Sequence, residues 1–254
     1  MKKYDIQNCR VISNQPISPD IFSMTVEAGP LADKARPGQF ALLFVPGKTL
    51  RRPFSFCEIG KEKGIIRFVF QVRGSGTARL ARIKPGESVN LLAPLGHGFD
   101  LSIGQRALFL GGGIGLPPLL AAASFRKGKA VLAAGFRTRE NVILENDFKL
   151  AGCPVRIATD DGSYGQKGLV TDLASDLAFD VIYACGPRPM LHAAAKLAES
   201  RGIPCQVSME ERMACGIGAC LGCAIKLRGI SGDYYGHVCC DGPVFDASSI
   251  VWED

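Results

Sequence analysis

Short apolar runs separated by turn-forming residues dominate the first hundred positions. The runs are rich in Val, Ile and Phe, and turn formers such as Pro37-Gly38 and Pro85-Gly86 stand between them. Six short strands at roughly even spacing predict a small antiparallel barrel. The predicted strands cover residues 4–13, 21–26, 39–45, 53–58, 65–71 and 88–92. One helix is expected to interrupt them, near residues 77–83.

The pattern changes near Arg106, where buried-type strands alternate with helical stretches. Strands are predicted at 107–110, 130–134, 155–158, 181–184 and 204–207, and helices at 116–125, 142–150, 169–177 and 189–199. This alternation predicts a parallel α/β sheet with right-handed crossovers. From Ser208 the chain is rich in Cys and Gly and has little periodicity, so we expect a small appendage built around something other than a hydrophobic core. The predicted domains are therefore 1–102, 103–207 and 208–254.

Charge and hydropathy narrow the class of protein. Thirty Lys and Arg against 24 Asp and Glu give a net charge of +6, without a run of five or six basic residues, so nucleic-acid binding is not expected as the main role. Asp5, Gln7 and Asn8 occupy the place that the apolar region of a signal peptide would need. The longest uncharged apolar stretch, 107–123, contains four glycines and two prolines and is a poor membrane span. We expect a cytoplasmic protein with no membrane segment.

The cysteines carry the strongest chemical signal. Of ten, six lie in the last fifty residues: Cys205, Cys215, Cys220, Cys223, Cys239 and Cys240. The spacing Cys215-x4-Cys220-x2-Cys223, followed after fifteen residues by Cys239, is typical of plant-type [2Fe–2S] clusters. Glycines between the ligands allow the backbone to aim N–H groups at the sulfurs. The alternatives are free structural cysteines or a zinc site, although zinc prefers paired C-x2-C knuckles and only one such pair exists.

Two further segments suit a nucleotide. The glycine run 111–115 follows an apolar strand and opens a helix, where a pyrophosphate can approach the backbone, although a tight strand–helix turn would also use glycines. The run 51–56 offers a guanidinium for a phosphate, an aromatic ring for stacking and a hydroxyl for a ring nitrogen. An ordinary strand with alternating faces explains this second run equally well when it is considered alone. The loop 74–77 is another small-residue turn that suits a phosphate.

Together these segments resemble the ferredoxin–NAD(P) reductase superfamily, in which a flavin barrel precedes a nicotinamide-nucleotide domain. Its R-x-[YF]-[ST] motif is met by Arg52, Pro53, Phe54 and Ser55, its G-x-G-x-G-x-x-P motif by Gly111, Gly113, Gly115 and Pro118, and its C-G-P-x-x-M motif by Cys185, Gly186, Pro187 and Met190. The tail segments 209–220 and 238–245 resemble the electron-transfer subunits of class 1B, NAD-dependent dihydroorotate dehydrogenases. The resemblance covers essentially the whole chain. In one departure, Cys240 stands where that family has no cysteine.

The resemblance implies FAD in domain 1–102, NAD as co-substrate in domain 103–207 and one [2Fe–2S] cluster in domain 208–254. It also implies a separate FMN-containing catalytic subunit that oxidises dihydroorotate to orotate in pyrimidine biosynthesis, and therefore a hetero-oligomer such as a heterotetramer. The chain alone is not expected to oxidise dihydroorotate, because no constellation in it suits deprotonation of a carbon acid.

The resemblance also assigns roles to single residues. Arg52 would neutralise the FAD phosphate, Ser55 would bond near flavin N5 and Cys185 would lie near nicotinamide C4. Val69, Phe70 and Gln71 would flank the flavin, Gly76 and Thr77 would hold its pyrophosphate, and Cys215, Cys220, Cys223 and Cys239 would hold the cluster. Cys239 is preferred to Cys240 because it matches the family's cysteine when counted back from Asp-Gly-Pro-Val-Phe, and because neighbours on an extended segment point to opposite sides.

Two competing functions and one cofactor choice complete the expectations. The first alternative is a subunit of a ferredoxin:NAD(P)⁺ oxidoreductase, a family whose tail lacks the Cys-Gly-Ile-Gly-Ala-Cys run, and the second is a zinc-stabilised binding module that kept the fold. NAD is expected rather than NADP, because Asp160 and Asp161 follow a predicted strand, where carboxylates suit a ribose diol and repel a 2′-phosphate. Arg137 and Arg139, after the preceding strand, favour the opposite choice.

Overall fold

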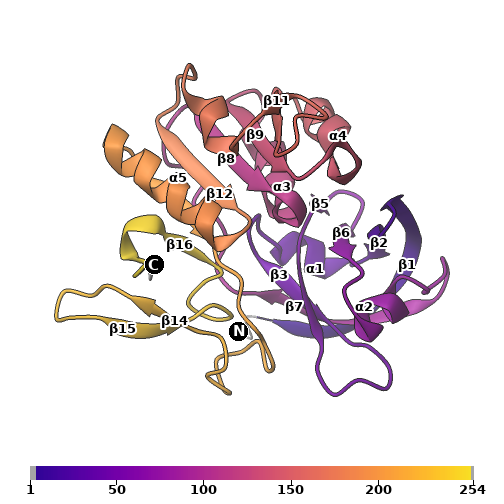
Figure 1. Cartoon of the computed structure of the whole chain (residues 1–254). Helices are drawn as coiled ribbons and strands as arrows, with labels where there is room; N and C mark the ends of the chain where they lie inside the picture. Colours follow the sequence, from indigo (N-terminus) through magenta and orange to yellow (C-terminus); the bar gives the residue numbers. More distant parts are fainter. Residues whose placement is uncertain (1–3, 253–254) are drawn as a thin grey trace.

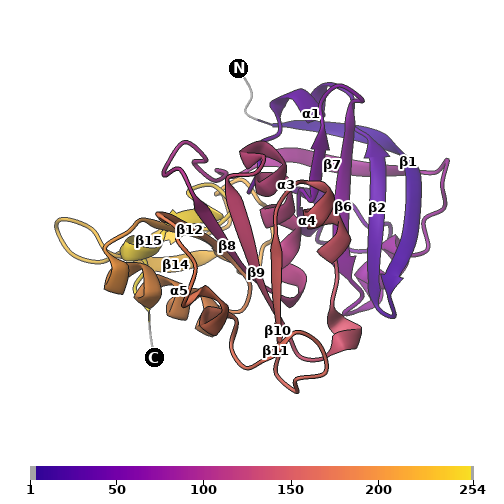
Figure 2. The same ribbon diagram turned by 90° about the horizontal axis from the view of Figure 1, so that it is seen from above.

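The N-terminal part of the chain forms one curled antiparallel sheet in the computed structural model, which describes residues 4–252 (Figures 1 and 2). Its seven strands are β1 (Asp5–Ser18), β2 (Ile21–Glu27), β3 (Phe40–Leu43), β4 (Arg52–Ser55), β5 (Glu58–Gly60), β6 (Ile65–Gln71) and β7 (Ser88–Leu95). They lie in the order β4-β3-β7-β1-β2-β6-β5, and every pair is antiparallel. The predicted antiparallel barrel architecture is confirmed, as a curled sheet whose end strands β4 and β5 are not hydrogen-bonded to each other.

The strand count differs from the predicted six because residues 53–58 form two strands instead of one. Phe56 and Cys57 between β4 and β5 are fully buried, so the chain turns inward there before pairing again with β6. Two short helices accompany the sheet, α1 (Pro30–Lys34) and α2 (Ser75–Leu80). Helix α2 matches the expected helix within a few residues, whereas α1 was not predicted, because Gly29-Pro30 was interpreted as a turn alone.

The central part of the chain is a second, mainly parallel sheet. Its strands are β8 (Ala107–Gly112), β9 (Ala130–Phe136), β10 (Val155–Thr159), β11 (Gln166–Lys167), β12 (Val181–Cys185), β13 (Cys205–Ser208) and β16 (Val244–Asp246). They lie in the order β11-β10-β9-β8-β12-β13-β16, and only β16 is antiparallel to its neighbour. The predicted α/β sheet is confirmed, and the C-terminal segment adds β16 to its edge.

Helices cover both faces of this sheet. Helices α3 (Leu116–Arg126) and α4 (Glu145–Leu150) pack with one buried cluster, and α5 (Arg188–Arg201) packs with the other. The stretch 169–177, predicted as a helix, is instead a short 3-10 segment, Val170–Ala174. The backbone N–H of Leu169 donates to the Asp172 carboxylate at 3.0 Å, which closes a tight turn in place of an α-helical start. Two further 3-10 turns, Gly113–Gly115 and Arg139–Asn141, precede α3 and α4.

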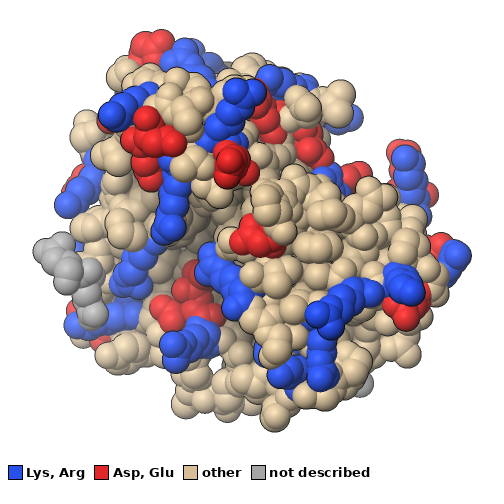
Figure 3. All heavy atoms as spheres, turned by 45° about the vertical axis from the view of Figure 1, so that its right-hand side comes forward, with Lys and Arg blue, Asp and Glu red and all other residues tan. Residues whose placement is uncertain are grey.

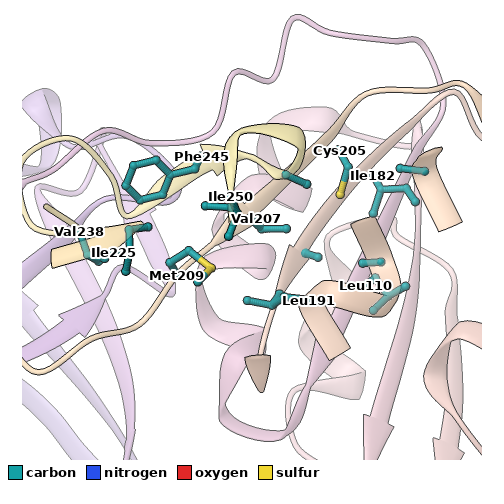
Figure 4. Close-up of a cluster of buried hydrophobic side chains, with 14 of the residues drawn as sticks. Leu110, Ile182, Leu191, Cys205, Val207, Met209, Ile225, Val238, Phe245 and Ile250 are labelled. Carbon is teal, nitrogen blue, oxygen red and sulfur yellow. The ribbon is translucent and has the colours of Figure 1, made fainter. Parts of the chain in front are cut away.

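The C-terminal segment shares the hydrophobic core of the α/β part, contrary to expectation. Its hairpin of β14 (Ala224–Leu227) and β15 (Tyr234–His237), with the 3-10 turn Ala247–Ser249, lies beside the sheet (Figure 1). Figure 4 shows Ile225, Val238 and Ile250 of this segment meeting Val207 and Met209 at the end of β13. Because one apolar cluster spans both parts, the cysteine-rich segment is anchored by hydrophobic packing.

A buried arginine joins the barrel to the α/β part. Arg126, at the end of α3, donates to the carbonyl oxygens of Leu101, Ile103 and Gly104 at 2.7, 2.9 and 3.0 Å. The hydroxyl of Tyr183 on β12 donates to Asp100 O at 2.8 Å in the same connection. These bonds fix the linker and hold the barrel against the sheet. Among residues 4–252, the structure contains no helix with both the length and the apolar character needed to cross a membrane.

Candidate functional site

Two cavities lie where the barrel meets the carboxyl ends of the parallel strands. The first, of about 290 Å³, is lined mainly by β4, β6 and the start of α3, and the second, of about 820 Å³, by the glycine turn after β8 and the ends of β9, β10 and β12. They share a wall made of Gln71, Arg73, Ile114, Met209, Glu210 and Glu211. In Figure 3 this face is hollowed, and acidic and basic side chains lie side by side on it without a large area of one sign.

The first cavity brings together most of the predicted flavin residues. Its lining includes Arg52, Pro53, Phe54, Ser55, Val69, Phe70, Gln71 and Thr77. Phe54 and Phe70 stand with ring centroids 5.1 Å apart and form an aromatic wall. Pairing of β4 with β3 fixes one side, and β6 supplies the other, so residues distant in sequence face one space. The part of the cavity formed by β4 and β6 is therefore largely apolar with the Arg52 guanidinium beside it, which suits a planar ring system attached to a phosphate.

Arg51, which directly precedes β4, and Arg52, its first residue, make different contacts. Arg51 donates to Leu42 O at 3.3 Å and, at 3.2 and 2.6 Å, to the backbone and side-chain oxygens of Asn90, so it braces β3 and β7. Arg52 donates only to nearby backbone oxygens, Leu50 O at 2.6 Å and Arg51 O at 3.3 Å. Because Arg52 lines the cavity and has further N–H groups to offer, it is the arginine that can meet a ligand phosphate.

The loop before α2 is shaped for close approach. A Cβ on Gly76 would lie 2.8 Å from Nε of Arg52, so the guanidinium would have to move from its present place if this residue were not glycine. The Thr77 hydroxyl accepts from the backbone N–H groups of Arg73 and Gly74 at 2.9 and 3.2 Å. Gly76 does not line the first cavity, but its lack of a side chain leaves room for the Arg52 guanidinium. Thr77 lines the cavity.

The second cavity receives the glycine turn after β8. Gly113 and Gly115 line it, together with Gly186, Pro187 and Met190 at the start of α5. A Cβ on Gly115 would lie 2.5 Å from the carbonyl oxygen of Cys185, so the turn packs directly on the end of β12. Gly111 does not line the cavity, since its missing side chain makes room for Leu116 and Leu119 of α3. Pro118 faces the first cavity instead of the second.

The far end of the second cavity contains the groups predicted to select the nucleotide. Asp160, Arg137 and Asn141 line it. Arg139 does not, because its guanidinium lies over the ring of Tyr164, 5.6 Å from the centroid. Asp161 is turned toward Ser163, whose hydroxyl and backbone N–H both donate to its carboxylate, at 2.6 and 2.9 Å. Of the two adjacent aspartates, Asp160 is therefore the one that lines the second cavity.

Cys185 lies behind the cavities and does not line either of them. Its side chain is 2% exposed, and it pairs across the sheet with Ser208. Burial raises the pKa of its thiol, and the nearby Glu210 carboxylate adds to that shift. The thiol is therefore neutral, and Glu210 is the ionisable group beside this strand end that reaches the open space.

The cysteine loop directs backbone N–H groups at sulfur. Cys215 Sγ accepts from the N–H groups of Ile217 and Cys220 at 3.5 and 3.4 Å, and Cys223 Sγ accepts from Cys239 N at 3.4 Å. Burial alone would raise the pKa of Cys215, but these backbone donors lower it to about 6. A thiolate is the form that binds metal, so the loop is prepared for ligation.

Cys239 is the predicted fourth ligand. Its Sγ accepts from Gly218 N at 3.3 Å, and burial together with the neighbouring Cys223 raises the pKa of its thiol. Cys215 lies close to Cys220, and Cys239 lies close to both Cys223 and Cys240. Cys240 Sγ lies within 4.8 Å of ligand atoms of His237 and Asp241, and it is also close to the loop, since a Cβ on Gly218 would be 3.0 Å from it. Neighbouring thiols with amide donors at the sulfurs fit the two irons of a [2Fe–2S] cluster.

The sequence motifs did not identify several residues that line the site. Arg73, Met209, Glu210 and Glu211 belong to the wall shared by both cavities. The last three directly follow β13, and the position just beyond the carboxyl end of a parallel strand is where ligands bind in such sheets. This rule could have identified the three residues after β13 from the sequence.

Comparisons with known proteins agree with this arrangement. A family profile described as the iron-sulfur cluster binding domain of dihydroorotate dehydrogenase B matches residues 210–251. The chain is 43% identical over 247 residues to the dihydroorotate dehydrogenase B (NAD(+)) electron transfer subunit of Caldanaerobacter subterraneus subsp. tengcongensis, covering 96% of this chain and 97% of that protein. It is 43% identical over 252 residues to the subunit of the same name from Bacillus caldolyticus, covering 95% and 96%.

Solved structures show the same fold. The NADH-dependent reduced ferredoxin-NADP oxidoreductase, studied for flavin-based electron bifurcation, superposes with a TM-score of 0.84 at 29% identity, covering 96% of this chain and 90% of that one. The ferredoxin reductase of carbazole 1,9a-dioxygenase superposes with a TM-score of 0.66 at 22% identity, covering 79% and 67%. The second likeness concerns the fold alone.

Proposed function

The chain belongs to the family of NAD(+)-linked dihydroorotate dehydrogenase B electron transfer subunits, and from this membership we propose that it carries electrons from a separate FMN-containing catalytic subunit to NAD⁺. The overall reaction would convert dihydroorotate and NAD⁺ to orotate, NADH and a proton, as part of pyrimidine biosynthesis. Within this chain the route would run through a [2Fe–2S] cluster and FAD. The partner subunit would supply the dihydroorotate site.

The adjacency of three sites carries this proposal. The two cavities share a wall, and the first cavity is also lined by Met213 and Pro243, which flank the cysteine loop and the fourth cysteine. Gly216 of the loop lies against the barrel, since a Cβ there would be 2.4 Å from Leu42 and 3.3 Å from Leu95. A group in the first cavity would therefore lie between the thiols and the nucleotide site, which is the order a relay needs.

The chain's own residues hold and separate the redox groups. When bound, FAD exchanges one or two electrons, the cluster exchanges one, and NAD⁺ accepts a hydride. Arg52 would meet the FAD phosphate, with Gly76 leaving room for its guanidinium and Thr77 closing the loop beside it. Val69, Phe70 and Gln71 on β6 would flank the flavin, and the Ser55 hydroxyl would face its ring edge.

The nucleotide would lie across the glycine turn. Gly113 and Gly115 leave the backbone open to a pyrophosphate, and Pro187 with Met190 borders the nicotinamide end. Cys185 would support that end with its backbone carbonyl, which packs on Gly115, while its thiol stays neutral and buried. Asp160 would bind the adenosine ribose at the opposite end.

The cysteine loop would face the FMN-containing subunit. Ile217 and Leu221, which lie between the ligands, are 42% and 62% exposed, an unusual position for large apolar side chains. Leu221 also has φ of 59°, so the loop holds this side chain outward at some backbone cost. Placing a one-electron centre beside an apolar contact shortens the path to a partner protein.

We further propose three functional units, 1–102 for FAD, 103–207 for NAD and 208–254 for the cluster, and a cytoplasmic location. The β13–β16 pairing and the shared apolar cluster imply that the third unit does not fold apart from the second.

An anaerobic visible spectrum before and after NADH tests the proposal. The purified holoprotein is expected to show flavin and iron–sulfur absorption, both bleached by NADH, because all three sites communicate. A colourless protein with zinc at the cysteines would instead support the zinc-stabilised binding module. Iron, sulfide and zinc contents measured on the same sample separate these outcomes.

The likeness to the ferredoxin-NADP oxidoreductase supports a second candidate, a subunit of a ferredoxin-linked complex. Higher identity over nearly the full chain favours the dihydroorotate-linked role. Coupled assays separate them, since the first candidate would require NADPH or reduced ferredoxin for turnover and the preferred function requires dihydroorotate with the FMN subunit.

A further inference from the structure

The junction between the two cavities is a distinct place in the molecule. Hydride transfer requires the donor and acceptor rings to approach within about 3–3.5 Å. Under the proposed function, one ring enters from each cavity, so they can meet only at the shared wall. The charged members of that wall are Arg73, Glu210 and Glu211. Their charges therefore act on the reacting rings more directly than any others in the site.

Glu210 is one of the two carboxylates at this junction. It follows the end of β13 by two residues, and its charge is near enough to the buried Cys185 thiol at the end of β12 to influence it. Its side chain is open to solvent within the hollow, yet the surrounding protein raises the pKa of its carboxyl, and Arg73 on the opposite, barrel side opposes that rise. Filling the cavities would remove the remaining water and strengthen its field.

The two redox forms of the nicotinamide ring differ in charge. The oxidised ring carries one positive charge, and the reduced ring is neutral. We propose that the Glu210 carboxylate makes the site selective for the oxidised nucleotide, by placing a negative charge beside the nicotinamide ring at the junction of the two cavities. Arg73, across the junction, has the opposite effect, so the pair sets the balance between binding of NAD⁺ and of NADH.

This inference rests on the proposed function and adds a residue that the motifs did not identify. It differs from the role of Cys185, which is neutral and buried, and from that of Asp160, which lies at the other end of the second cavity. The charge of Glu210 should therefore change the affinity for ligands whose nicotinamide ring is charged, and leave the affinity for ligands with a neutral ring nearly unchanged.

The test compares two ligands that cannot react with the oxidised holoprotein. Calorimetry gives the Kd of NAD⁺ and of tetrahydro-NAD, an analogue whose ring is neutral and cannot transfer hydride. Glu210→Gln is expected to weaken NAD⁺ about tenfold, or about 1.4 kcal/mol. The neutral analogue should stay within about twofold of wild type. Glu210→Asp, which keeps the charge, should restore most of the preference.

Two further variants make the result specific. Arg73→Gln should change the ratio of the two Kd values in the opposite direction, and it tests the idea even if Glu210→Gln fails to load FAD. Glu199→Gln, on an exposed part of α5 outside both cavities, removes the same charge and should leave the ratio unchanged. Flavin absorbance of each variant confirms that it carries FAD.

The outcomes separate this inference from the proposed function. If wild type binds both ligands but neither Glu210→Gln nor Arg73→Gln changes the ratio, the selectivity proposal is overturned and the proposed function stands. If both ligands weaken equally in Glu210→Gln, the residue shapes the site without reading ring charge, and the inference is also overturned. If wild-type holoprotein binds neither ligand, the proposed function fails and the inference fails with it.

Discussion

Gly115 lies against the backbone of Cys185, so closely that a Cβ would stand 2.5 Å from the Cys185 carbonyl oxygen. This contact joins the turn after β8 to the end of β12, the two places where the nucleotide motifs fall. Gly115→Ala must therefore displace one strand end from the other. We expect it to cost about 1–3 kcal/mol of unfolding free energy, as overpacking does, and to weaken NADH binding at least as strongly.

Thermal unfolding and NADH titration of the variant check this expectation. Gly74→Ala is the matched control, because no heavy atom lies within 4 Å of a Cβ there and its backbone is extended. Equal effects of the two substitutions would show that the close approach of β8 and β12 has no special role.

The neighbouring arginines should separate stability from flavin binding. Arg52→Ala removes the guanidinium that lines the first cavity and should lose roughly 1.5–3 kcal/mol of FAD affinity, with little change in unfolding of the flavin-free protein. Arg51→Ala leaves Asn90 and Leu42 O without their donor and should lower the unfolding free energy by about 1–3 kcal/mol. Flavin content after dialysis and Tm distinguish them. Interchanged results would assign the phosphate to Arg51.

Cys239 and Cys240 should differ completely as cluster ligands. Cys239→Ser is expected to abolish the iron–sulfur absorption, because Cys239 Sγ lies with Cys223 and accepts from Gly218 N. Cys240→Ser should retain the cluster, since Cys239 is the cysteine that matches the family's position before Asp-Gly-Pro-Val-Phe. Iron and sulfide contents per chain are the measurement. Loss of the cluster only in Cys240→Ser would reverse the assignment.

Much of this fold was predictable, because the spacing of apolar residues along a strand or helix and the turn-forming residues between them are local features of the sequence. The strands from β1 to β3 and from β6 to β13 fall near their predicted positions, with the exception of the two-residue β11, since alternating apolar runs between Gly and Pro leave few other solutions. The division of 53–58 was not predictable, because the inward turn at Phe56 and Cys57 depends on burial against the rest of the barrel. The 3-10 segment Val170–Ala174 depends equally on one capping contact, that of Asp172.

The part of the candidate site that lies within a short sequence motif was predictable. Arg52–Ser55 and the four cysteines were found because their chemistry requires fixed spacing. Glu210 and Arg73 were missed because they come from opposite sides of the junction and meet only in the folded chain. Cys185 was expected to lie near nicotinamide C4, and this stays a prediction, since its side chain is buried and lines neither cavity.

Nucleotide preference should depend on Asp160. Its carboxylate faces the second cavity, so Asp160→Ala should improve kcat/KM for NADPH by about tenfold relative to NADH, because repulsion of a 2′-phosphate is lost while Arg137 remains. Asp161→Ala is the control, since that carboxylate is held by Ser163 and does not line the cavity. Dye-reduction rates with both nucleotides provide the test. A wild-type preference for NADPH would refute the assignment.

The relay itself is tested most directly by NADH formation from dihydroorotate and NAD⁺, measured for this chain alone, for the FMN-containing subunit alone and for the reconstituted complex. The chain alone should reduce artificial dyes with NADH yet form no NADH from dihydroorotate, and only the complex should couple the two. The complex carrying Cys223→Ser should lose that coupling because its cluster is missing. Dihydroorotate turnover by the single chain, or full coupling in the Cys223→Ser complex, would contradict the account.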